Sequence, residues 1–178
     1  GATLNLTAAT ASSTTTFTGN FTNSGTVKVN DSTNTVSLVG AAGSLRNFSG
    51  TDIDYNGKAI TLTNITYNPA VALGASEAIT LGGACTFAST ITLNGAGASL
   101  TTGAYTLTGQ NTITNTVGTI TISSGGAINI GANAFSNSGT VSSSGALTCG
   151  NFTSSGTYTN AATNTIASSG DVVISGTF

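Results

Sequence analysis

The sequence predicts an all-β fold of the β-solenoid class, in which short strands stack coil upon coil. Three observations favour this fold. Apolar residues alternate with Thr, Ser and Asn at the two-residue period of half-buried strands. Turns rich in Gly, Ser and Asn break these strands every few residues. Strands this short bury very few side chains, so they are expected to become stable only when similar coils stack above and below them.

The stretch 119–141, TITISSGGAINIGANAFSNSGTV, shows the pattern most clearly. Single isoleucines alternate with polar residues, and glycine turns separate one short strand from the next. The residues expected to point inward in and after this stretch are Ile120, Ile128, Phe135, Val141, Leu147 and Phe152, whereas Thr119, Thr121 and Asn129 are expected to face outward.

From Ile60 onward the apolar residues recur at short, regular steps. Grouping them by threes gives a three-sided β-helix with coils of about 20 residues. The first face is predicted to carry Leu62, Leu81, Leu100, Ile120, Val141, Tyr158 and Phe178. The second is predicted to carry Phe87, Leu107, Ile128, Leu147 and Ile166, and the third Ile91, Ile113, Phe135, Phe152 and Val172.

The N-terminal part of the chain is less regular, but residues 1–178 are predicted to form one domain. Residues 1–18 carry only Leu4, Leu6 and Phe17 as apolar anchors, which fits either a first capping coil or an extended arm. Residues 28–77 hold most of the charged side chains, and we interpret them as the more decorated coils of the same domain.

The composition argues against several functions. Charged residues make up 4% of the chain and the net charge is −2, so no basic patch for nucleic acid or anionic lipid is expected. The sequence also holds no run of ~18 apolar residues, the length that a membrane-spanning helix needs. Gly1 is not a translation start, which suggests a processed or partial chain. We expect an extracellular or cell-surface protein, secreted after removal of a signal peptide.

A seven-residue phrase recurs along the chain. The residues Phe21-Thr-Asn-Ser-Gly-Thr-Val27 return almost unchanged at 135–141 and 152–158, and weakly at 175–178. The aromatic residue is an inward side chain, the Ser-Gly pair makes a corner, and Thr begins the next strand. These phrases resemble the β-solenoid repeats of filamentous-haemagglutinin-type adhesins and autotransporter passengers. The resemblance implies a secreted surface protein that adheres, with glycans as candidate partners, or assembles.

One short motif resembles the start of a calcium loop. Asp52, Asp54 and Asn56 stand at alternate positions and Gly57 follows, but the expected glutamate at the twelfth position is Thr63. The alternative is a strand that ends in an Asn-Gly turn. The two aspartates also form the best candidate acid/base pair, yet the chain has no His and few other carboxylates. We therefore expect no enzymatic activity and no cofactor other than this candidate calcium ion.

The two cysteines, Cys85 and Cys149, are predicted to lie on one face three coils apart. That separation is about 14 Å, beyond the ~7 Å between Cα atoms that a disulfide allows. They are expected to be buried and free, and a bridge between subunits is the alternative. Six sequons are candidate glycosylation sites, namely Asn5, Asn20, Asn30, Asn47, Asn64 and Asn151.

Thr-x-Thr pairs recur at positions 61, 90, 106, 112 and 119. Aligned pairs would form a flat ladder similar to the ice-binding face of β-solenoid antifreeze proteins, but the predicted register spreads them over different faces. The alternative is that Thr is simply favoured at exposed strand positions.

The sequence as a whole favours a structural protein that associates with itself. Few charges, one Pro and open β edges leave little to prevent pairing between chains. We expect a homopolymer, head to tail, in an extracellular filament, sheath or surface fibre; the alternatives are an adhesin passenger fragment or an ice-binding solenoid. The residues predicted to make the assembly contact are Leu4, Leu6, Phe17, Val172, Val173, Ile174 and Phe178.

Overall fold

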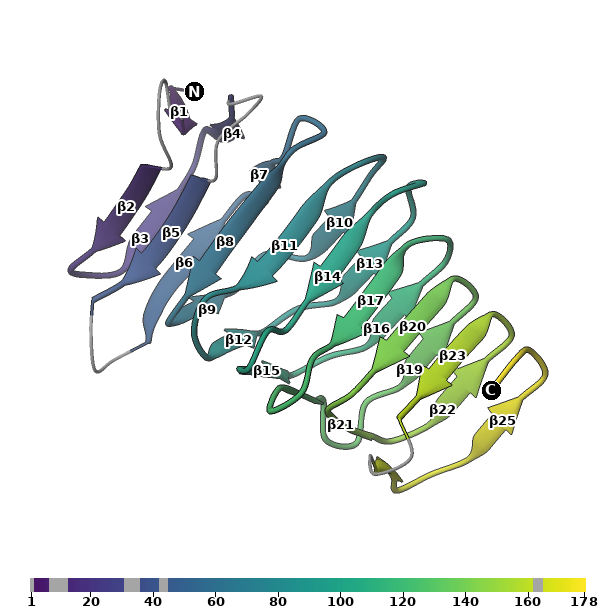
Figure 1. Ribbon diagram of the computed structural model, residues 1–178. Helices are drawn as coiled ribbons and strands as arrows, with labels where there is room; N and C mark the ends of the chain where they lie inside the picture. Colours follow the sequence, from purple (N-terminus) through teal and green to yellow (C-terminus); the bar gives the residue numbers. More distant parts are fainter. Residues whose placement is uncertain (1, 7–12, 31–35, 42–44, 162–164) are drawn as a thin grey trace.

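The computed structural model describes residues 2–6, 13–30, 36–41, 45–161 and 165–178. In these ranges the chain is all β, with 25 short strands and no helix. The strands stack into a β-solenoid of about seven turns with about 21 residues per coil, and the stack forms an elongated rod (Figure 1). The predicted fold class is therefore confirmed.

The first face of the rod is an eight-stranded sheet in which every pairing is parallel. Its strands, in order, are β2 (Ser13–Phe17), β5 (Val36–Gly40), β8 (Ala59–Thr63), β11 (Ala78–Leu81), β14 (Ser99–Thr101), β17 (Thr119–Ile122), β20 (Thr140–Ser143) and β23 (Thr157–Asn160).

The second face is a parallel sheet of the same size. It contains β3 (Phe21–Asn23), β6 (Arg46–Gly50), β9 (Ile65–Tyr67), β12 (Cys85–Phe87), β15 (Thr106–Gly109), β18 (Ala127–Asn129), β21 (Ala146–Cys149) and β24 (Ile166–Ser168).

The third face is divided into two sheets, whose strands hold the same place in successive coils. The smaller sheet contains β1 (Thr3–Leu6), β4 (Thr26–Val29) and β7 (Ile53–Asp54). The larger contains β10 (Val71–Leu73), β13 (Ile91–Leu93), β16 (Ile113–Asn115), β19 (Phe135–Asn137), β22 (Phe152–Ser154) and β25 (Val172–Ile174). We call the break between β7 and β10 the seam.

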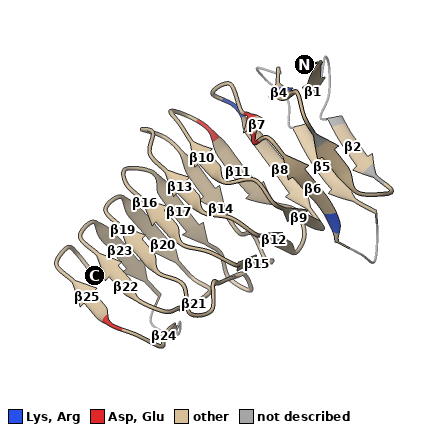
Figure 2. Ribbon diagram, turned by 180° about the vertical axis from the view of Figure 1, so that it is seen from behind, with Lys and Arg blue, Asp and Glu red and all other residues tan. Residues whose placement is uncertain are grey.

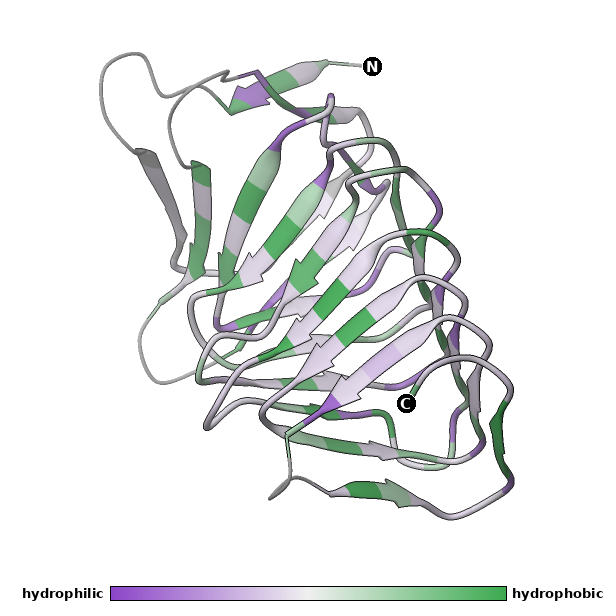
Figure 3. Cartoon of the chain, turned by 45° about the vertical axis from the view of Figure 1, so that its right-hand side comes forward, coloured by the Kyte–Doolittle hydropathy of each residue, from purple (hydrophilic) through white to green (hydrophobic). Residues whose placement is uncertain are grey.

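One core of inward side chains runs along the rod, and the alternating colours of Figure 3 follow the alternation of inward and outward residues. Thr119 and Asn129 are exposed and Thr121 is half-buried, as predicted. The inward residues predicted for positions 120–152 are all buried, namely Ile120, Ile128, Phe135, Val141, Leu147 and Phe152.

The pairing on the third face agrees with the predicted column throughout, because Ile91, Ile113, Phe135, Phe152 and Val172 are successive partners. On each of the other two faces, the predicted pairing is shifted by two residues at one step. Leu100 pairs with Ile79 and not with Leu81, because the inward residue that continues the Leu81 column is the polar Thr102, which is fully buried.

On the second face Leu107 pairs with Cys85, and Phe87 pairs with Gly109. The apolar pattern does not detect Gly109 as an inward residue. The prediction therefore paired Phe87 with Leu107, the preceding inward residue. A slip of two residues keeps every side chain on its own side of the sheet, which is why the predicted faces remained correct.

The N-terminal residues belong to the first coil. β1 pairs with β4 from Thr3↔Thr26 to Leu6↔Val29, and β2 pairs with β5. The two segments are packed closely at Gly25, where an added Cβ would lie 2.1 Å from the carbonyl oxygen of Ala2. In the described residues this arrangement corresponds to the capping alternative for residues 1–18.

Candidate functional site

The C-terminal edge of the rod, formed by β25 and the residues up to Phe178, exposes large apolar side chains. Val172 is 55% exposed and Phe178 is 60% exposed, and Val173 and Ile174 are exposed as well. In the interior the same columns are completely covered: Val172 follows Phe152, which is fully buried. Phe178 continues the column of Tyr158, and the two rings are stacked with their centroids 5.4 Å apart. The C-terminal edge therefore presents the core in cross-section.

Backbone groups along this edge also have a defined direction. The carbonyl of Asp171 accepts from the N–H of Phe152, and the N–H of Ser175 donates to Ser154, so these groups face β22. Because backbone groups alternate in direction along a strand, the N–H and C=O groups of Val172 and Ile174 face the open edge.

The N-terminal edge, β1, has the complementary arrangement. The carbonyls of Ala2 and Leu6 accept from Thr26 and Asn30, so these residues face β4. By the same alternation, the backbone groups of Thr3 and Asn5 face away from the sheet. Leu6 is buried, whereas Leu4 is 43% exposed. Of the predicted assembly residues only Phe17 has a side chain outside the described part of the structure; its backbone ends β2.

The outer surface of the first face carries two columns of hydroxyl side chains. One column runs through Ser37, Thr61, Thr80, Thr101, Thr121, Ser142 and Thr159. The other contains Ser99, Thr119, Thr140 and Thr157, in register with the first. The columns are about 6.7 Å apart along the strand, with about 4.8 Å between successive strands. The Thr-x-Thr pairs themselves lie on different faces, as predicted. The two columns of the first face arise because Ser99, Thr140 and Thr157 align with Thr119, which the Thr-x-Thr pattern does not show.

Charged residues lie mainly in the N-terminal half of the rod, with Asp171 near the opposite end (Figure 2). The Lys28 Nζ and the Asp54 Oδ2 are 3.6 Å apart, and both side chains are substantially exposed. A pair of this kind contributes little to stability. The outer surface of the first face between β8 and β23 is uncharged.

Asp52 lies at the seam, where its carboxylate is partly buried. Its Oδ1 accepts from the N–H of Ile53 at 2.8 Å and from the hydroxyl of Tyr67, with Tyr55 Oη at 3.4 Å. Its Oδ2 lies 3.4 Å from the N–H of Ala72 in β10. One carboxylate thus takes hydrogen bonds from both sides of the break in the third face.

Burial raises the pKa of Asp52, and its hydrogen bonds from Tyr67, Ile53, Ala72 and Tyr55 oppose this effect. The pKa of Tyr67 is raised by burial and by the nearby Asp52 carboxylate, so its hydroxyl remains a donor at neutral pH. These contacts occupy the acceptor sites of the carboxylate. The candidate acid/base pair is therefore divided between a seam contact at Asp52 and the surface at Asp54.

The candidate calcium ligands Asp54 and Asn56 make hydrogen bonds within the protein. Asp54 Oδ1 accepts from the N–H of Asn56, and the side-chain amide of Asn56 donates to the carbonyl of Val29. Among the described residues no three His, Cys, Asp or Glu side chains are grouped closely enough to hold a metal ion. The calcium site at Asp52, Asp54 and Asn56 stays a prediction.

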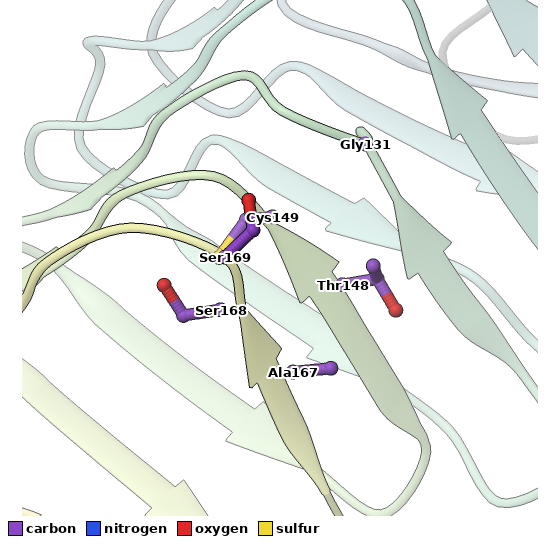
Figure 4. Close-up of a pocket in the computed structure, with 6 residues that line it drawn as sticks. All are labelled: Gly131, Thr148, Cys149, Ala167, Ser168 and Ser169. Atoms are coloured by element: carbon purple, nitrogen blue, oxygen red, sulfur yellow. The ribbon is translucent and has the colours of Figure 1, made fainter.

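Both cysteines are buried and unbridged, as expected. Burial raises the pKa of the Cys85 thiol to about 11. Burial also raises the pKa of the Cys149 thiol, so both thiols are protonated at neutral pH. Cys149 lines an open pocket of about 260 Å³ (Figure 4). The pocket lies between β21 and β24, and the other lining residues are Gly131, Thr148, Ala167, Ser168 and Ser169. A protonated thiol among hydroxyl and alkyl groups has no base to activate it, so the pocket offers no nucleophile.

The candidate glycosylation sites differ in accessibility. Asn5, Asn20, Asn30, Asn47 and Asn151 are exposed. Asn64 is half-buried and has a φ of 55°, so its side chain is the least accessible of the six.

A buried polar ladder, which we call the amide ladder, was not anticipated. It consists of Asn115, Asn137 and Ser154 at successive turns of the third face. Asn115 Nδ2 donates to Asn137 Oδ1 at 2.9 Å, and Asn137 Nδ2 donates to Ser154 Oγ at 3.1 Å. The same amides donate to the carbonyls of Thr140 and Thr157 on the first face. The ladder therefore fastens the corner between these two faces.

A signal for the ladder was present in the sequence. Each ladder residue stands two positions after a buried apolar residue, as in Ile113-x-Asn115 and Phe135-x-Asn137, so alternation alone places it inside.

No helix in the described chain is long and apolar enough to cross a membrane. The chain matches no family model, no curated protein and no solved structure.

Proposed function

We propose that this protein is a structural, self-assembling subunit of an extracellular filament, sheath or surface fibre, and that its coils stack end to end on those of other copies. The observation that carries the proposal is the exposed apolar C-terminal edge. Val172, Ile174 and Phe178 occupy core columns, yet their side chains are exposed at this edge. Covering ~100 Å² of apolar surface contributes about 2.5 kcal/mol, so such an edge favours a further coil.

The rest of the surface supports the same proposal. The described chain has little charge to oppose association, and the charge that is present lies mostly far from the C-terminal edge. The polar Thr and Ser side chains of the three faces keep the sides of the rod wettable. Association is therefore directed to the ends and not to the sides.

The test is the state of association as a function of concentration. Sedimentation velocity and negative-stain microscopy should show species that lengthen as the protein concentration rises. Phe178→Asp should reduce this association, because it places a charge in the contact. Tyr105→Asp is the matched control, because Tyr105 is also an exposed aromatic residue but lies in the middle of the rod. Particles of single-chain length at every concentration would refute the proposal.

The two hydroxyl columns of the first face favour ice binding as a second candidate. They form a flat, uncharged array in which hydroxyl and methyl groups repeat in two directions. An array of this kind is suited to ordering water in a lattice.

Thermal hysteresis and the shape of growing ice crystals test this candidate. Thr121→Tyr should abolish both effects, because the larger ring interrupts the first face. Thr108→Tyr, on the second face, should leave both unchanged. Equal activity of the two variants, or an inactive parent protein, would exclude this function.

A further inference from the structure

We infer that the contact between copies is head-to-tail and has a fixed register, in which β1 of one copy pairs in parallel with β25 of the next. This inference deepens the proposed function and rests on it. In this register Leu4 lies on Val172, and Leu6 lies on Ile174.

The side chains support this register. On β25, Val172 and Ile174 continue the inward columns of Phe152 and Ser154. On β1, Leu4 and Leu6 stand on the inward columns of Val27 and Val29. Both strands therefore present two apolar residues at the same i, i+2 spacing, on the same side of the sheet.

The backbone groups agree with it as well. In a parallel pair, a residue that bonds across the gap lies opposite a residue whose groups point away, as Phe152 lies opposite Val172 inside the rod. The groups of Val172 and Ile174 face the open C-terminal edge, and those of Leu4 and Leu6 face β4. The N–H of Val172 would then donate to Thr3, and the N–H of Asn5 would donate to Val172.

The contact continues an arrangement that the molecule already uses. All strand pairings in the described chain are parallel, and each coil lies on the preceding one with inward columns aligned. A contact between two C-terminal edges would make the strands antiparallel and leave both N-terminal edges uncovered. The head-to-tail contact covers one C-terminal edge and one N-terminal edge, so it repeats without closing and gives an open filament.

A single contact of this kind is expected to be weak. A coil of about 21 residues, at ~3.3 Å per residue, has a perimeter of ~70 Å and a triangular cross-section of roughly 230 Å². This is small beside the ~800 Å² that each partner buries in a standard protein interface. Assembly should therefore require high protein concentration.

Proline substitutions test whether the contact is head-to-tail. Val172→Pro removes one open-edge N–H and keeps an apolar residue in the column, and Asn5→Pro does the same at the N-terminal edge. Each variant alone should be monomeric at concentrations where the parent protein polymerises. An equimolar mixture should give one-to-one dimers that grow no further, because only one intact edge of each kind remains. Val173→Thr is the control, since it changes an outward side chain and should polymerise like the parent protein.

The outcomes are distinguishable. If either proline variant still dimerises alone, the contact joins two edges of the same kind. The head-to-tail register is then wrong, although self-assembly itself stands. If the parent protein does not associate, the proposed function fails together with the register. Circular dichroism and protection of core amides from exchange must show that both proline variants are folded. A variant that unfolds is replaced by Ile174→Pro or Thr3→Pro, which block the same two edges.

Discussion

The corners of the third face are held by different side chains in its first coils and in its later coils. In the first coils, where Val27 pairs with Ile53, the coil is long and the corner is held at the seam by the carboxylate of Asp52. In the later coils, where Phe135 pairs with Phe152, the coil is short and the corner is held by neutral amides. The comparison shows that coils of variable length tolerate a single charged acceptor, whereas regular coils allow a side-chain ladder that repeats from turn to turn.

The largest effect is expected in the regular region. Phe135→Asp places an unpaired charge in a narrow core, where Phe135 is fully buried and stacked on Phe152. The cost should exceed about 4 kcal/mol, so the variant should not fold. Circular dichroism and the loss of protected amides measure this outcome, and a folded variant would contradict the core as described. Ser136→Asp, which changes the half-buried neighbour on the outer side, should remain folded.

The second prediction breaks the amide ladder. Asn137→Ala removes the bonds to Asn115, Ser154 and the carbonyl of Thr157, and leaves buried groups unsatisfied. Urea denaturation should show a loss of about 2–4 kcal/mol in the free energy of unfolding. Ser136→Ala is the matched control and should stay within about 0.5 kcal/mol. Equal effects of the two substitutions would show that the ladder is not a source of stability.

The third prediction concerns pH and the seam. Because burial raises the pKa of Asp52 in the folded state, the folded chain binds a proton more readily than the unfolded chain. The contribution of Asp52 to stability is then fully present below its unfolded pKa, near 3.9, and is lost as pH rises through its higher folded pKa. Urea midpoints measured between pH 3 and 7 should fall with pH over that window. Asp52→Asn should remove this fall, whereas Asp54→Asn should keep it.

The smallest effect is expected at the end of the amide ladder, where a new hydrogen-bond donor can be added. Asn115 Oδ1 is buried without a hydrogen-bond donor, and Leu93 precedes Asn115 in its column. Leu93→Asn could donate to this oxygen, whereas Leu93→Ala cannot, and both lose apolar burial. We expect Leu93→Asn to be about 1 kcal/mol more stable than Leu93→Ala. The reverse order, in urea denaturation, would show that the new amide does not reach Asn115.

Much of this fold follows from alternation. The third-face column from Ile91 to Val172 was predicted residue by residue because each strand there begins with an apolar residue at the same inward position. The shifts at Leu81 and Phe87 arose where the inward position is Thr102 or Gly109, neither of which an apolar pattern detects.

The details of the seam depend on tertiary contacts that are not encoded locally. The sequence offers Asp52 as a candidate calcium ligand because Asp, Asp and Asn stand at alternate positions. Its hydrogen-bond partners Tyr67 and Ala72 come from the next coil and are recognisable only when the coil length is known. The double hydroxyl column was missed for the same reason, since it requires the register of β14 to β23.

The seam also has a mechanical consequence. Tension along the rod axis pulls successive coils apart, and each coil is held by the backbone bonds of its three strands. Between β7 and β10 the described chain has no strand pairing on the third face, and there the Asp52 carboxylate accepts a hydrogen bond from the backbone N–H of Ala72 in β10. A stretched rod should therefore yield first at this point, and a fibre of such rods would extend in steps while its regular segments stay intact.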